Sequence, residues 1–257
     1  MKRTWLITGA ASGLGRELSS RLSRRGERLV LWDRDADRLD RTRGLLGPAV
    51  VHHEIVDVTS PESTREAAHR SADVAGHITN AIHCAGILRV GPSLAMSATD
   101  YRAMIEVNYL GTVYLARAII PHLLEASRPS RRSQLAFVAS VAGLRGVPAL
   151  AGYSASKHAV IGFAQALRDE LDPRTLDLRV VCPPPLSTPM VTNLPELPAV
   201  YRLSPPRDAA RVSEDILAAL ESSDFMVLVG ARTKLLWHMQ RALPSGLDWA
   251  LRRAAKR

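Results

Sequence analysis

The chain has 257 residues, of which 46% are hydrophobic, and its formal net charge is +9. This composition is ordinary for a soluble globular protein, and the length suits one α/β unit. We find no apolar run that approaches the length of a membrane span, which argues against a chain that spans a bilayer. The two cysteines, Cys84 and Cys182, fall in or beside predicted strands and need not pair.

A buried strand is predicted at residues 5–8, and a glycine-rich turn follows it directly. The turn reads Gly9-Ala-Ala-Ser12-Gly13-Leu14-Gly15 and precedes a helical pattern of leucines. Glycines at such a junction let the backbone turn tightly and approach a pyrophosphate, which free N–H groups at the helix start can bind. Taken alone, the spacing also fits a simple tight turn.

A second strand at residues 28–32 ends in Asp33. An acid at this distance from the glycines suits a ribose 2′-hydroxyl and repels a 2′-phosphate, so we expect NAD to be preferred over NADP. Two alternatives stay open. Asp33 can belong to a helix N-terminus with Asp35 and Asp37, or Arg34 can hold a 2′-phosphate while Asp33 turns aside.

Strand-like runs alternate with helical ones along the rest of the chain. Further strands are predicted at residues 50–56, 78–84, 135–139, 178–181 and 225–229. Right-handed crossovers between parallel strands then give a Rossmann-like, doubly wound α/β fold of about seven strands with helices on both faces. We predict one catalytic domain over residues 1–230, with a substrate lid at about 190–207, and a helical extension over residues 231–257.

Tyr153 and Lys157 lie one helical turn apart, so both polar tips can reach one site. A neighbouring cation favours the phenolate of a tyrosine, and we therefore expect Lys157 to bring the pKa of Tyr153 toward the working range. Ser140 closes the strand at residues 134–139, on the side of a parallel sheet where ligands bind. Its hydroxyl can donate to a developing oxyanion while it accepts from Tyr153.

These motifs together resemble the short-chain dehydrogenase/reductase family, in its branch of roughly 250 residues. The matching pieces are Thr8-Gly9-x-x-x-Gly13-x-Gly15, Asp57-Val58, Ala85-Gly86, Asn108, Ser140, Tyr153-x-x-x-Lys157 and Pro183 with Thr188. The resemblance implies that Tyr153 is the acid/base and that Lys157 lowers its pKa and binds the nicotinamide ribose. It further implies that Ser140 binds the substrate oxygen and that Asn108 holds a relay water.

The same resemblance implies a cofactor site. Its residues would be Gly9, Ser12, Gly13, Leu14, Gly15, Asp33, Arg34, Asp57, Val58, Ala85, Gly86, Tyr153, Lys157, Pro183 and Thr188. The chain departs from the family at His83-Cys84, where Asn-Asn is usual, and at Pro184, where glycine is usual. We read His83 and Cys84 as a packed pair and expect no metal site, because no third ligand of suitable spacing accompanies them.

The predicted lid is apolar, with Val191, Leu194, Leu197, Val200, Tyr201 and Leu203. Leu144 and Val147 are expected to line the same pocket, so the substrate is expected to be a hydrophobic secondary alcohol or ketone. One alternative is an NADPH-preferring ketoacyl- or polyketide-type carbonyl reductase. Others are a nucleotide-sensing protein without catalysis and a membrane-surface scaffold. We expect a homodimer or homotetramer, with an interface on the long helices near residues 100–125 and 150–172.

The positive charge is concentrated at the end of the chain. Residues 231–257 hold seven basic residues and one acid, Asp248, so they carry +6 of the net +9. Apolar residues alternate with these charges, as in a basic amphipathic helix, which can lie on an anionic membrane, pack on a second subunit or fold over the cleft. No motif favours a nucleic-acid partner. No signal peptide precedes Trp5, so a cytoplasmic location is expected, with peripheral membrane contact as an alternative.

Overall fold

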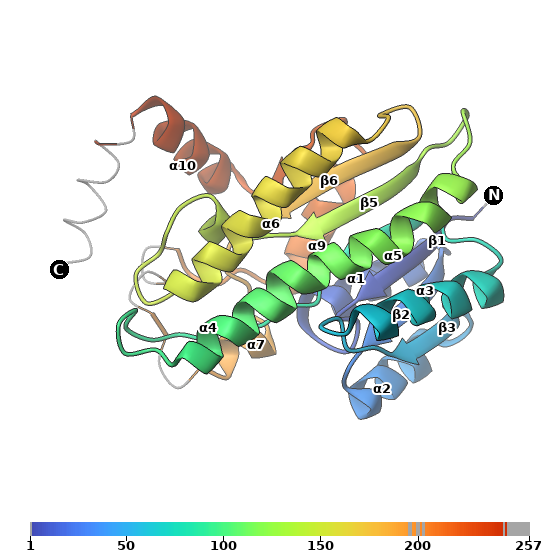
Figure 1. The fold of residues 1–257 in the computed structure, drawn as a ribbon, viewed down its shortest axis with the longest axis horizontal. Helices are drawn as coiled ribbons and strands as arrows, with labels where there is room; N and C mark the ends of the chain where they lie inside the picture. The colour runs from blue at the N-terminus through green and yellow to red at the C-terminus, as the bar shows by residue number, and fades with distance from the viewer. Residues whose placement is uncertain (1, 195–196, 199–200, 202–203, 244, 246–257) are drawn as a thin grey trace.

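The computed structural model describes residues 2–194, 197–198, 201, 204–243 and 245. Seven parallel strands form one sheet in the order β3-β2-β1-β4-β5-β6-β7 (Figure 1). The strands are β1 (Thr4–Thr8), β2 (Arg28–Asp33), β3 (Val50–Ile55), β4 (Asn80–His83), β5 (Ser133–Val138), β6 (Leu176–Cys182) and β7 (Met226–Leu228). The predicted doubly wound parallel sheet is confirmed, and every predicted strand overlaps an observed one.

Helices cover both faces of the sheet (Figure 1). They are α1 (Gly13–Arg24), α2 (Ala36–Leu46), α3 (Pro61–Ala75), α4 (Ala98–Ile105), α5 (Gly111–Ala126), α6 (Ala151–Glu170), α7 (Pro189–Thr192), α9 (Ala209–Ala219) and α10 (Ala231–Ala242). Short turns of 3-10 helix lie at η1 (Gly47–Ala49) and η3 (Val141–Gly143), and a π-helix, η2 (Glu106–Leu110), joins α4 to α5. The side chains of α3, α5 and α6 pack on one face, and those of α1, α2 and α9 on the other.

The continuous apolar character of the strands follows from this double cover. Leu6 and Ile7 are neighbours in β1, and both are fully buried. Leu6 belongs to the core under α3, α5 and α6, whereas Ile7 belongs to the core under α1 and α9. Because successive strand residues point to opposite faces, a strand covered on both sides must be apolar at every position.

The helical segment over residues 98–126 is long and apolar enough to cross a membrane, by length and composition alone. This corrects our expectation that no segment reaches that length. In the fold the segment forms α4, the π-helix and α5, and Leu115, Ile119 and Leu123 pack into the sheet core. Its apolar composition is that of a core helix, which passes the same test.

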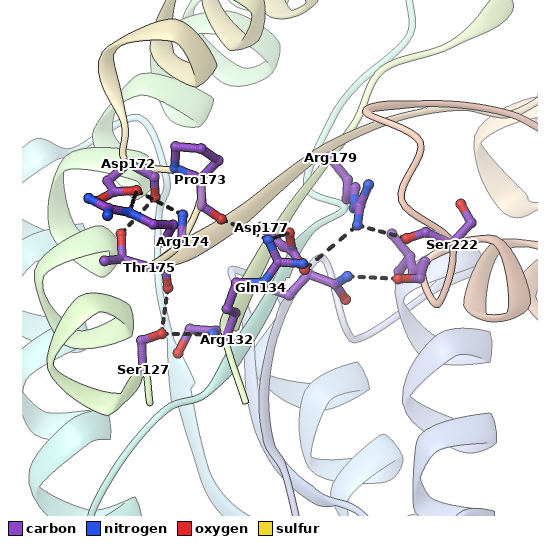
Figure 2. A network of polar contacts seen from close by, with 12 residues as sticks. Ser127, Arg132, Gln134, Asp172, Pro173, Arg174, Thr175, Asp177, Arg179 and Ser222 are labelled. Carbon is purple, nitrogen blue, oxygen red and sulfur yellow. Dashed lines mark hydrogen bonds and ion pairs between the residues drawn. The ribbon is translucent and has the colours of Figure 1, made fainter. Parts of the chain in front are cut away.

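The amino-terminal halves of β5 and β6 are held by a polar network (Figure 2). Arg132 forms an ion pair with Asp177 (Nη1–Oδ1 3.1 Å) and donates to the carbonyl of Pro173 (2.7 Å). The buried Arg179 lies 3.7 Å from Asp177 and donates to the carbonyl of Ser222 (2.7 Å). The network ties together the loops before β5, β6 and β7. At this end of the sheet the polar side chains therefore join the loops to one another.

Candidate active site

A cleft of about 1430 Å³ opens at the opposite end, above the carboxyl ends of the strands. Ligands bind at this edge in open parallel sheets. All the predicted site residues except Asn108 lie on its wall. They are Gly9, Ser12, Gly13, Leu14, Gly15, Asp33, Arg34, Asp57, Val58, Ala85, Gly86, Ser140, Tyr153, Lys157, Pro183 and Thr188.

The glycine turn between β1 and α1 is shaped for close approach of a ligand to the backbone. Gly9 and Gly13 have φ angles of +65° and +52°, which residues other than glycine rarely adopt. A Cβ on Gly15 would overlap the carbonyl of Gly9, so this contact also needs glycine. Ser12 caps α1 with extended backbone and no side-chain hydrogen bond, and the first residues of the helix, whose N–H groups have no partner within the helix, line the cleft. This cradle fits the pyrophosphate of a dinucleotide.

Asp33 is fixed at the end of β2 by two backbone donors. Its Oδ2 accepts from the N–H of Ala11 (2.9 Å) and its Oδ1 from the N–H of Asp35 (3.0 Å). Each carboxylate oxygen keeps a further lone pair for a ribose hydroxyl. Arg34 is exposed on the same wall, and Arg38 is paired with Asp35 at 3.3 Å. An acid and basic side chains thus line the same part of the cleft, at the end of β2.

His83 replaces the usual asparagine by anchoring a threonine hydroxyl. Thr8 Oγ1 accepts from the N–H groups of Cys84 and Ala85 (both 3.1 Å) and lies 2.8 Å from His83 Nδ1. Since Thr8 already accepts two hydrogen bonds, its own proton points at Nδ1, and the imidazole proton is assigned to Nε2. Burial and the nearby Lys157 lower the pKa of His83 to about 3, so the ring stays neutral.

Ser140, Tyr153 and Lys157 meet at the centre of the cleft. Ser140 starts η3, where its Oγ accepts from the N–H of Ala142 (3.1 Å). Its side chain also lowers the pKa of the Tyr153 phenol. Lys157 is buried, donates to the carbonyl of Val138 (2.8 Å), and holds its Nζ 5.8 Å from the centre of the Tyr153 ring. The predicted acid/base group and its two partners are therefore brought together by β5, η3 and α6.

The pKa of Tyr153 differs from our expectation. Burial raises it to about 12, with the hydrogen bond from Ser140 acting in the opposite direction and the nearby Tyr201 raising it further. Burial also lowers the pKa of Lys157 to about 8. The prediction that Lys157 brings the pKa of Tyr153 down is wrong for this structure, because burial of the phenol raises that pKa and Lys157 is not among the groups that shift it.

Asn108 lies beside the cleft and fastens its wall. The side chain is fully buried in the π-helix, where Oδ1 accepts from Ile87 N (2.8 Å). Nδ2 donates to Ile87 O (3.0 Å) and to Ser156 Oγ (2.9 Å). These bonds use the side chain to join the loop after β4 to α6. Oδ1 and the main-chain carbonyl, which accepts from Thr112 (2.7 Å), each keep a second lone pair that can accept a hydrogen bond from a water.

Comparison with known proteins agrees with this geometry. Residues 3–198 match the family model for short chain dehydrogenases. The chain belongs to the short chain dehydrogenase family. It is thus an oxidoreductase that acts on hydroxyl or ketone groups with a nicotinamide cofactor.

Individual relatives differ in the substrates that their names specify. The chain is 35% identical to the 1-deoxy-11-beta-hydroxypentalenate dehydrogenase of Streptomyces avermitilis, over 74% of this chain and 71% of that protein. It is 30% identical to the 3-oxoacyl-[acyl-carrier-protein] reductase of Thermotoga maritima, over 74% of this chain and 77% of that protein. A crystal structure of a short chain dehydrogenase from Burkholderia cenocepacia in complex with NADP is 30% identical, with a TM-score of 0.82 over 97% of both chains.

In this short chain dehydrogenase two of the three prolines after β6, at positions 183–185, accept backbone hydrogen bonds. The carbonyl of Pro183 accepts from Val141 N (3.1 Å), and Pro185 O accepts from Arg207 N (2.8 Å). The side chain of Thr188 faces Gly13, where a Cβ would lie 3.4 Å from it. Despite Pro184, the segment after β6 is therefore hydrogen-bonded to η3 and to Arg207, and Thr188 lies beside the glycine turn.

The cleft wall also includes residues that the family motifs do not mark. From the predicted lid, Met190, Val191, Tyr201, Ser204 and Arg207 line the cleft, whereas Val200 and Leu203 lie outside the described residues. Leu144 and Val147 line it as predicted. Helix α10 adds Arg232, Thr233, Leu235, Trp237 and Gln240. The only sequence signal for these last residues was the amphipathic pattern of residues 231–257, which left their location open.

Proposed function

We propose that the chain interconverts a hydrophobic secondary alcohol and its ketone, with Tyr153 as the acid/base. The observation that carries this proposal is the apolar cluster around the reactive phenol. Leu88, Leu150, Val191 and Tyr201 are buried there. Val90, Val147, Leu194 and Tyr153 itself pack against them. A wall of this kind desolvates an apolar substrate and offers few partners to a charged one.

The chain's own groups account for the proton in this reaction. In ketone reduction the carbonyl carbon gains a hydride, and the phenol of Tyr153 gives its proton to the oxygen that becomes negative. In alcohol oxidation the phenolate takes the hydroxyl proton as the carbon loses its hydride. The nicotinamide supplies or accepts that hydride when it is bound. Ser140 lies where its hydroxyl can donate to the same oxygen and orient it toward Tyr153.

Lys157 and the glycine turn position these groups. The ammonium of Lys157 is held by Val138 O beside the Tyr153 ring, within reach of a ribose in the cleft. We propose NAD(H) as the preferred cofactor, supported by Asp33 at the ribose end. Arg34 on the same wall and the NADP-bound relative support the alternative, an NADPH-preferring ketoacyl or polyketide-type reductase. The pentalenate-type dehydrogenase supports a bulky apolar substrate.

We further propose that the protein is a homo-oligomer. Tyr109, Leu110, Val113 and Tyr114 are only partly buried in one chain, although they lie on the most apolar helical segment. A second copy would cover this surface.

The test is an activity panel of NAD(H) and NADP(H) with apolar secondary alcohols, their ketones and small charged hydroxy acids. We expect turnover of the apolar compounds with NAD(H). A tenfold or greater preference for NADPH would overturn the cofactor assignment, and turnover of charged hydroxy acids alone would overturn the substrate class. Tyr153→Phe is the matched control: we expect it to bind cofactor normally and to lose about 10²–10⁴-fold in turnover.

A further inference from the structure

Helix α10 carries an exposed apolar stripe. Leu235, Met239 and Leu243 are 60%, 38% and 67% exposed. Leu235 and Met239 are four residues apart and share one helix face, and Leu243, the residue that caps the helix, continues this spacing with its N–H bonded to the carbonyl of Met239 (2.8 Å). The other large exposed hydrophobic side chains in the described part of the chain are Leu45, Ile55, Val74, Leu94, Leu124, Met190 and Leu197, and they are scattered over separate elements. A continuous stripe of this kind marks an interaction surface, whereas single exposed residues are normal.

The same helix is basic and has no acidic residue. Residues 231–242 contain Arg232, Lys234 and Arg241. Arg241 lies over the Trp237 ring at 5.4 Å. The sequence beyond the helix continues this bias, with four basic residues and one acid in positions 244–257. An apolar face with basic flanks is complementary to a lipid surface that carries anionic headgroups.

The charge also argues against a second copy as the occupant of the stripe. In a two-fold contact the same surface meets itself, so the basic residues of the two helices would be brought together. Like charges placed opposite each other across an interface cost free energy. Within residues 231–242, no carboxylate is present to offset them.

The stripe is continuous with the cleft. Leu235 belongs to the exposed stripe and also lines the cleft, next to Trp237 and Gln240 on the inner side of the helix. Figure 1 shows α10 at a distance from the body of the fold, on the side toward which the arrow of β5 points. A surface that binds the stripe would therefore lie against the cleft mouth.

We propose that α10 docks the protein on an anionic lipid surface and places the cleft mouth at the bilayer, so that a lipophilic alcohol or ketone enters from the membrane. The substrate part of this inference rests on the proposed function. The docking part rests on α10 alone. Leu235, Met239 and Leu243 enter the interface between headgroups and acyl chains, while Lys234 and Arg241 contact the headgroups.

The experiment uses full-length protein and flotation with two kinds of vesicle, pure phosphatidylcholine and phosphatidylcholine mixed with phosphatidylglycerol. We expect binding to the mixed vesicles, little binding to the pure ones, and weakening by salt. The variant Met239→Gln/Leu243→Gln, which spares the cleft residue Leu235, should bind the mixed vesicles about tenfold more weakly. The control, Leu45→Gln/Leu94→Gln, removes two apolar side chains that are even more exposed (80% and 104%) but lie outside α10, and it should bind like the native chain.

Activity readouts separate the two parts of the proposal. With a water-soluble alcohol, Met239→Gln/Leu243→Gln should turn over at the native rate, whereas with a bilayer-dissolved alcohol its rate should fall in parallel with vesicle binding. Absent or charge-independent vesicle binding by the native chain would overturn the docking. So would a stripe variant whose only change is a lower oligomer mass in light scattering, since the occupant would then be a second copy. Normal vesicle binding without turnover of any apolar alcohol would refute the proposed function and leave the docking intact.

Discussion

The two ends of the sheet handle buried polar groups in opposite ways. At the amino-terminal end the buried Arg179 lies beside Asp177, which also pairs with Arg132, so charge is compensated by charge (Figure 2). At the carboxyl end Lys157 is equally buried, but its hydrogen-bond partner is a neutral carbonyl, that of Val138. Among the described residues no carboxylate contributes to its electrostatics.

The consequence is visible in the pKa values around the cleft. Burial comes first among the causes in each case, lowering the pKa of His83 to about 3 and of Lys157 to about 8, and raising that of Tyr153 to about 12. Burial thus shifts each of these groups toward its neutral form near the cleft, whereas the buried arginine at the other end of the sheet lies beside a carboxylate. We infer that the amino-terminal end supplies stability and that the carboxyl end gives some of it up for function.

The largest effect is expected for Lys157→Met, which removes the uncompensated charge. Turnover should fall by about 10²-fold or more, because Tyr153 and the ribose lose the cation that positions them. The free energy of unfolding at pH 7 should stay level or rise. The rise is at most about 3 kcal/mol, because burial lowers the pKa of Lys157 from 10.5 to about 8 and each pKa unit corresponds to ~1.4 kcal/mol. Kinetics and chemical denaturation of the native and variant proteins measure the two quantities.

The effect of Lys157 on stability should depend on pH. Lys157 has a pKa of about 8 when folded against an ordinary value of 10.5, so between these values the unfolded chain binds the proton and the folded chain does not. Stability of the native protein from this group therefore rises with pH across that window. The difference between Lys157→Met and the native chain should shrink over the same window. Lys234→Met, at an exposed lysine, is the control, and a difference that does not vary with pH would contradict the assignment.

Gly15→Ala should abolish nucleotide binding. This variant tests whether binding at the carboxyl end of the sheet requires the backbone shape of the glycine turn. The new Cβ would overlap the Gly9 carbonyl, so the turn must open and the N–H cradle is lost. The control is Gly162→Ala in α6, where a Cβ meets nothing within 4 Å. It should keep nucleotide binding and gain up to ~1 kcal/mol in stability from helix propensity. Calorimetric titration with NAD(H) measures the binding, and retained affinity in Gly15→Ala would refute the cradle.

The site residues at the carboxyl end of the sheet could be predicted because they belong to motifs with short, fixed spacing. The glycine turn, Asp33 and the Tyr153–Lys157 pair each need particular residue types at short, fixed separations, and each lies on the cleft wall as expected. Seven strands were predictable because apolar runs between turn residues are local too. The direction of the pKa shift at Tyr153 was not predictable, since it depends on burial and on residues as distant in the sequence as Tyr201, which packs in the same cluster.

The amino-terminal end shows the opposite case. Arg132 and Asp177 lie 45 positions apart in the sequence, and neither stands in a recognisable motif. Their pairing follows only from the register of β5 against β6, in which Gln134 faces Asp177. The role of His83 was hidden for a similar reason, because its partner Thr8 is in another strand. Contacts between residues far apart in the sequence therefore cannot be predicted from the sequence alone, whereas the chemistry of a local motif can.

The smallest effect that still distinguishes the two ends is expected at Arg179. Arg179→Met leaves Asp177 paired with Arg132 but deprives the Ser222 carbonyl of its donor, so we expect a loss of about 1–3 kcal/mol in stability. Turnover should not change, because no residue of the network lines the cleft. Arg174→Met is the matched control: its side chain is 87% exposed beside Asp172 in the same loop region, and its melting temperature should equal that of the native protein. Equal melting temperatures for both variants would show that burial of Arg179 contributes nothing. A fall in turnover for Arg179→Met at temperatures where it is fully folded would show instead that the two ends of the sheet are coupled.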